Sequence, residues 1–84
     1  MFKFGDVIYR PCLSYAGKKN FVSTQIVLES FVKGEKHYIR SIDFVGQTWT
    51  DRVTDLGETF FYSRENAEKE LKILIKKKEE MANV

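Results

Sequence analysis

Residue types that commonly carry covalent structure or chemistry are scarce in this sequence of 84 residues, which has one cysteine, one histidine and one proline. A single cysteine excludes a disulfide within the chain, and one cysteine with one histidine is too few for a zinc site built from those two residue types. The five glycines are scattered, so no glycine-rich loop is present to hold a phosphate group. We therefore predict neither a metal nor a cofactor.

Long hydrophobic runs are also missing. Asp6, Arg10 and Pro11 interrupt the amino-terminal residues, which therefore do not form the apolar segment of a secretory signal. The longest uncharged stretch covers only residues 20–28, far short of the roughly 20 apolar residues that a membrane span needs. Because a lone Cys12 also suits a reducing interior, we expect a cytoplasmic protein with no membrane partner.

The composition is that of one small globular domain over residues 1–84, with 43% hydrophobic, 31% charged and 14% aromatic residues. Apolar residues alternate through residues 1–62 and recur with a helical period over residues 63–81. The expected strands cover residues 2–9, 21–32, 37–44, 48–53 and 59–62. The fold class is thus α+β: a small, strongly bent antiparallel sheet or an SH3-like barrel of about five strands, with one C-terminal helix.

The segment over residues 21–32 has the strongest β signal. One face of it collects mostly apolar side chains, namely Val22, Thr24, Ile26, Leu28 and Val32. The other face mixes polar residues with three apolar ones, Phe21, Val27 and Phe31, which we expect the helix to cover. At about 3.3 Å per residue the segment would be roughly 40 Å long, so it should bend sharply and serve two sheets. Pro11 is expected to end the strand before it, because proline has no N–H to donate.

The C-terminal helix has a start signal and an apolar stripe. Ser63 can accept a hydrogen bond from the first turn, and the stripe consists of Ala67, Leu71, Leu74, Ile75 and Met81. Ile73 points away from the stripe among charged neighbours, which makes it a candidate contact for a partner.

Two segments resemble known proteins. Phe4-Gly5-Asp6-Val7-Ile8-Tyr9 resembles the first strand of SH3-like and KOW-like barrels. The residues from Phe60 to Leu71 resemble an "F-x-[ST]-R-E-x-A-x-x-x-L" strand-to-helix junction found in short uncharacterised accessory proteins of Firmicutes, their phages and other mobile elements. This resemblance implies a small accessory protein, of a kind that includes binders and blockers of host or defence machinery.

Residues able to perform catalysis are few. Cys12 and His37 could act as nucleophile and base only if the fold joined them, and we expect an inert thiol and an exposed imidazole instead. Asp51, Asp55 and Glu58 fall in one connection, but their spacing is not that of a calcium loop, so we interpret them as solvated turn residues. The sequence therefore predicts no enzyme.

The function predicted from the sequence is a non-enzymatic binding module that occludes a protein partner. The resemblance implies the role of an inhibitor of a host or defence system, carried by a mobile element. Aromatic residues at loop tips and basic groups near them are typical of interface contacts. The candidate partner-binding residues are Tyr15, Lys18, Lys19, Trp49, Arg52 and Ile73.

The alternative is a nucleic-acid-binding SH3-like barrel, in which aromatic residues stack on bases and basic residues contact phosphates. Its candidate residues are Tyr9, Trp49, Lys18, Lys19, Arg40 and Arg52. The formal net charge of only +2 does not by itself indicate such a partner. A homodimer formed through an unpaired sheet edge is a further alternative.

Overall fold

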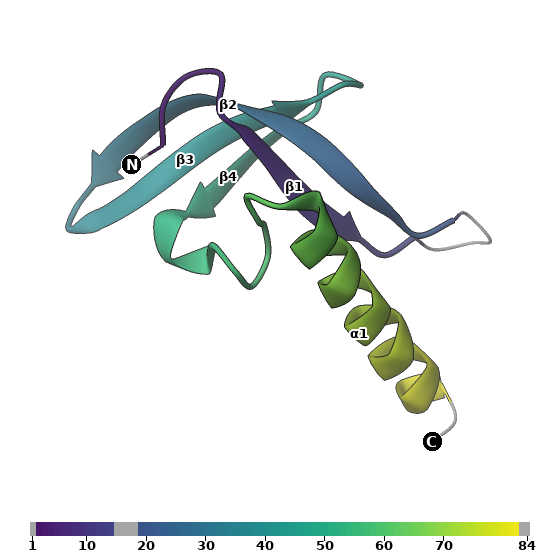
Figure 1. Cartoon of the computed structure of the whole chain (residues 1–84). Helices are drawn as coiled ribbons and strands as arrows, with labels where there is room; N and C mark the ends of the chain where they lie inside the picture. The colour runs from purple at the N-terminus through teal and green to yellow at the C-terminus, as the bar shows by residue number, and fades with distance from the viewer. Residues whose placement is uncertain (1, 15–18, 83–84) are drawn as a thin grey trace.

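The computed structural model describes residues 2–14 and 19–82, and over these residues it shows one sheet and one long helix (Figure 1). The elements are β1 (Val7–Cys12), β2 (Phe21–Lys33), β3 (Lys36–Asp43), β4 (Thr48–Arg52), a 3-10 turn η1 (Val53–Asp55) and α1 (Arg64–Ala82). The strands form an antiparallel sheet in the order β1-β2-β3-β4. The α+β class with a C-terminal helix is therefore confirmed, but the described sheet is open and has four strands rather than five.

The fifth expected strand, over residues 59–62, is reduced to isolated bridges. Phe61 exchanges two backbone hydrogen bonds of 2.8 Å with Tyr9, at the edge of β1 that points away from β2. Phe60 forms an isolated bridge with Leu56. The chain then leaves the sheet, because the Ser63 hydroxyl accepts a hydrogen bond from the Asn66 N–H at 3.3 Å and α1 begins. One bridging residue does not close a barrel.

The expected first strand was also misplaced, because β1 begins at Val7 and continues through Pro11. Successive residues of an antiparallel strand direct their backbone groups to opposite edges. The backbone groups of Tyr9 bond to Phe61, at the edge of β1 that points away from β2. The backbone of Pro11, two residues later, points to that same edge, so its missing N–H removes no hydrogen bond to β2. The residues before β1 form a turn instead, in which Gly5 has a φ of +92° and donates its N–H to the Val27 carbonyl.

The bend expected in the long second strand is present. The register between β2 and β3 shifts between Val27 and Glu29, which leaves Leu28 as the extra residue of a bulge. The bulge reverses which side chains of β2 share a face, so Phe31 and Glu29 lie with Tyr38 and Arg40 of β3. In the described chain both halves of β2 belong to one sheet, not two.

The two faces of the sheet differ from the sequence-based expectation. On the face that we call the inner face, Ile8, Val27 and Ile39 are buried with Phe2 and Phe60 in the apolar core. The same face carries four buried polar side chains, Arg10, Ser23, Gln25 and Ser41. The more apolar side of β2, with Val22, Thr24 and Ile26, is only half-buried on the opposite, outer face.

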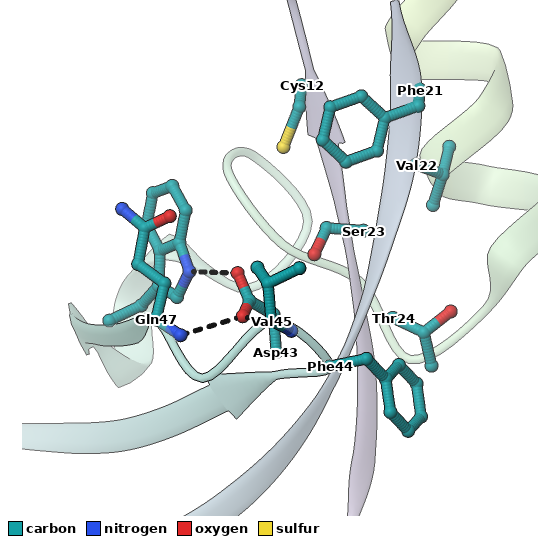
Figure 2. Close-up of a pocket in the computed structure, with 10 residues that line it drawn as sticks. Cys12, Phe21, Val22, Ser23, Thr24, Asp43, Phe44, Val45 and Gln47 are labelled. Atoms are coloured by element: carbon teal, nitrogen blue, oxygen red, sulfur yellow. Dashed lines mark hydrogen bonds between the residues drawn. The ribbon is translucent and has the colours of Figure 1, made fainter.

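The helix packs on the outer face of β1 and of the first half of β2, which corrects the expectation that it covers Phe21, Val27 and Phe31. Arg64, at its first turn, donates to the Thr24 hydroxyl at 3.3 Å and lies 6.0 Å from the ring centre of Tyr9. Figure 2 shows Val22 and Thr24 on the helix side of β2, and Cys12 and Ser23 on the other side. On the outer face of β3 and β4, Arg40, Thr48, Thr50 and Arg52 are exposed.

Candidate functional site

A polar network crosses the inner face and joins the two end strands of the sheet. Arg10 of β1 forms a two-pronged ion pair with Asp51 of β4, one arm of which measures 3.1 Å, and both side chains are about nine-tenths buried. The Arg10 guanidinium also lies 4.4 Å from the ring centre of Trp49. These contacts fix the position of Trp49 at the edge of the inner face.

Gln25, fully buried in β2, completes this network. Its side-chain oxygen accepts from Arg10 at 3.3 Å and from the Ser41 hydroxyl at 3.1 Å. With the amide in its other orientation, the oxygen accepts from the Trp49 indole N–H at 3.1 Å. In the described residues no buried side-chain nitrogen or oxygen lacks a partner, so the network is saturated and is structural in character.

Beside this network, β2 has a short stretch of unpaired backbone. Val27 exchanges backbone hydrogen bonds with Gly5 and Asp6 on the β1 side, so the odd-numbered residues of this part of β2 bond towards β1. Val22 and Thr24 then direct their N–H and C=O groups to the side of β3. The pairing with β3 begins only at Gln25, which faces Asp43, so the register gives Val22 and Thr24 no partner in β3.

An apolar hollow of about 370 Å³ lies next to this free edge (Figure 2). Its walls include Phe21 and Val22 of β2, Phe44 and Val45 of the turn between β3 and β4, and Trp49. The apolar side chains around it are well exposed: Phe21 is 52%, Phe44 80% and Val45 88% accessible. Scattered exposed apolar residues are ordinary, but three around one hollow form a patch typical of an interaction site.

The carboxylate of Asp43 builds the turn that presents Phe44 and Val45. It accepts hydrogen bonds from the backbone N–H of Val45 at 3.1 Å and of Gln47 at 2.8 Å, and from the Trp49 indole at 3.4 Å. Gly46 completes the turn with a φ of +88°. The two most exposed apolar side chains at the hollow are thus held by a rigid turn whose anchor is itself tied to Trp49.

A second surface lies on the uncovered outer face of β2, β3 and β4. The rings of Phe31 and Tyr38 stack across the strands with centres 5.5 Å apart. Together with Lys33, Arg40 and Thr50 they line a shallow hollow of about 360 Å³. Lys36 and Arg52 lie on the same face by register, because Lys36 faces Lys33 and Arg52 faces Tyr38. We call the six residues Phe31, Lys33, Lys36, Tyr38, Arg40 and Arg52 the outer-face patch.

The structure does not gather the residues predicted to bind a protein. Trp49 lines the apolar hollow, whereas Arg52 lies on the outer face of β4 and Ile73 is exposed on α1. Lys19 is exposed just before β2, and Tyr15 and Lys18 lie outside the described residues. Sequence reasoning missed Phe44 and Val45. They stand next to Gly46 and between two expected strands, a position from which a turn presenting apolar side chains could have been predicted.

The residues predicted to bind nucleic acid are divided as well. Arg40 and Arg52 share the outer face, but Trp49 lies on the inner face and Tyr9 lies beside Arg64 at the start of α1. Sequence reasoning missed the stacked Phe31 and Tyr38, because the bulge at Leu28 that brings them to one face has no marker such as glycine in the sequence.

The groups considered for catalysis are far apart or engaged. Cys12 pairs with Phe21 at one end of β2, while His37 pairs with Val32 at its other end. Burial raises the pKa of the Cys12 thiol, and the nearby Arg10 charge only partly opposes this effect. Asp51 is bound to Arg10, and the described residues hold no group of three or more His, Cys, Asp or Glu placed to bind a metal ion.

Comparison with known proteins gives no match to a family model, to a curated protein or to a solved structure. The resemblance of the two end segments to short accessory proteins therefore stays a prediction. Among the described helical residues, none form a segment long and apolar enough to cross a membrane.

Proposed function

We propose that this chain is a non-enzymatic module that binds a protein partner through the apolar hollow at the free edge of β2. The observation that carries the proposal is the exposure of Phe44 and Val45 on a rigid turn, directly beside unpaired backbone at Val22 and Thr24. An apolar surface next to free backbone donors and acceptors matches the requirements of an extended peptide segment.

The partner segment that fits this surface is an extended strand with a bulky apolar side chain. Its main chain would exchange hydrogen bonds with Val22 and Thr24, which extends the sheet where β3 stops short. The apolar side chain would enter the hollow that Phe21, Phe44 and Val45 line. Because the free edge offers only two residues, the backbone bonds alone are few, and specificity depends on the side chain.

Binding of this kind acts by occlusion. A partner segment held against β2 is no longer available for its own contacts, and the remainder of this domain blocks access to it sterically. Phe44 and Val45 are expected to supply most of the binding free energy, since full burial of one such side chain contributes about 1.5–3 kcal/mol.

The test begins with selection of peptides from a displayed random library against the whole chain. The selected peptides are expected to be extended, with a large apolar residue, and their affinity should fall at least about tenfold for Phe44→Ser. Val32→Ser provides the matched control, because Val32 is 57% exposed but lies at the opposite end of β2.

Equal loss of affinity for Phe44→Ser and Val32→Ser would show that the hollow is not the binding surface. Selection of no peptide at all would also count against the proposal. Selection of a segment of this chain itself would replace the foreign partner with a second copy.

A further inference from the structure

We propose that the outer-face patch is a separate binding site for single-stranded nucleic acid. The patch lies on the outer face of β3, β4 and the second half of β2, whereas the apolar hollow lies at the other end of β2. The inference rests on the charge and the aromatic pair of the patch and does not depend on the function proposed for the hollow.

Charge is the first argument. Lys33, Lys36, Arg40 and Arg52 place four basic groups on this face, and Glu29 is the one acidic residue that the described parts of these strands add to it. The strands thus place a net charge of +3 on this face, and the exposed Glu35, in the turn between Lys33 and Lys36, lowers the local value to +2, so this small area carries as much positive charge as the whole chain. A modest overall charge conceals a concentrated basic surface, which is the electrostatic footprint of a polyanion site.

The Glu29 carboxylate does not block this surface. Its contact with Arg40 is 3.4 Å long, and both side chains are about half exposed. Exposed pairs of this kind contribute little stability, so a phosphate group can displace Glu29 from the guanidinium.

The aromatic pair is the second argument, and it favours nucleic acid over an acidic polypeptide. Phe31 and Tyr38 are nearly parallel, at 19°, and they flank the hollow that Lys33, Arg40 and Thr50 also line. Aromatic rings beside basic groups are the arrangement on which unpaired bases stack while phosphates pair with lysine and arginine. Bases within a duplex are already stacked on one another, so the patch should prefer a single strand.

The test is fluorescence anisotropy of a labelled oligothymidine of about 12 nucleotides, measured with the whole chain over a range of salt concentrations. The logarithm of the association constant should fall linearly with the logarithm of the salt concentration, with a slope of about −3 for four phosphate contacts. The double variant Arg40→Gln with Arg52→Gln should reduce the magnitude of that slope by about 1.4. Lys72→Gln with Lys76→Gln, on the exposed face of α1, removes the same charge elsewhere and should leave the slope nearly unchanged.

Tyr38 distinguishes stacking from charge alone. Tyr38→Leu should weaken binding about fivefold or more at constant slope, and Tyr38→Phe should retain the affinity, which also controls for folding. No binding at low salt would overturn the proposal, as would equal effects of the outer-face and helix variants. Equal affinity for a duplex or for polyglutamate, together with no effect of Tyr38→Leu, would overturn it in favour of a general polyanion or an acidic protein.

Discussion

Arg10 and Asp51 belong to the two end strands of the sheet, yet their side chains form an ion pair across the inner face. In a flat sheet three strand spacings would separate β1 from β4 by about 14 Å, too far for these side chains to meet. The pair is therefore made across the concave side of a strongly curled sheet. It also positions Trp49, and through Trp49 and Asp43 it connects to the turn that presents Phe44 and Val45.

The first prediction concerns this ion pair. Asp51→Ala should lower the free energy of unfolding by about 3 kcal/mol or more, because it leaves the buried Arg10 charge without its partner. Urea denaturation of the variant and the wild type measures the difference. Glu68→Ala, which removes an exposed partner of Arg64 on α1, should cost less than about 1 kcal/mol.

The double variant Arg10→Met with Asp51→Leu distinguishes two contributions to the loss of stability: the cost of a buried charge without a partner, and the loss of the ion pair itself. It should be more stable than Asp51→Ala alone, since it removes both buried charges and keeps the volume filled. If Asp51→Ala is no more destabilising than Glu68→Ala, the pair does not hold the two end strands together.

The second prediction concerns Cys12. Burial raises the pKa of its thiol, so the fraction of reactive thiolate at a given pH is smaller in the folded chain than in the unfolded chain. Alkylation by iodoacetamide should be several-fold slower in the folded chain near pH 8, and its rate should rise with pH to a midpoint above that of the urea-unfolded chain. A midpoint at or below the unfolded value would contradict the half-buried environment assigned to Cys12.

The third prediction separates binding from folding at the apolar hollow. Phe44→Ser with Val45→Ser should change the free energy of unfolding by no more than about 0.5 kcal/mol, because both side chains are exposed. Phe60→Ala, in the core, should cost about 3–5 kcal/mol in the same thermal or urea experiment. A large loss of stability in the double serine variant would mean that the two residues serve the fold rather than a partner.

The arrangement of elements was predictable where side-chain periodicity decides it. Ser63 and the helical stripe located α1 to within one residue at each end, and Gly34 located the β2–β3 turn. The position of Pro11 inside β1 was not predictable, because it depends on which edge of the strand faces Phe61, and that pairing is made with a residue far along the chain. The same limit explains the lost fifth strand, whose residues favour β structure but meet β1 at one residue only.

The candidate site was less predictable than the fold. Ser23 and Gln25 have a polar pattern typical of solvent exposure. They can nevertheless be buried, because Gln25 accepts hydrogen bonds from Arg10 and Ser41 and donates one to the Ser23 hydroxyl. Because the polar side of β2 is buried on the inner face, α1 packs on the opposite side, which carries Val22 and Thr24. The strand β3 ends at Asp43, three residues short of the position that would face Val22, and this creates the free edge. Only the register shows that mismatch.

The most direct measurement is amide hydrogen exchange at Val22 and Thr24, with and without a peptide selected against the hollow. In the free chain these two amides should exchange fast, while those of Ser23 and Gln25, bonded to β1, exchange slowly. With the peptide bound, exchange at Val22 and Thr24 should slow at least about tenfold and become comparable to that of their neighbours. Slow exchange at Val22 and Thr24 in the free chain, or no change when the peptide binds, would contradict binding of a partner strand at the edge of β2.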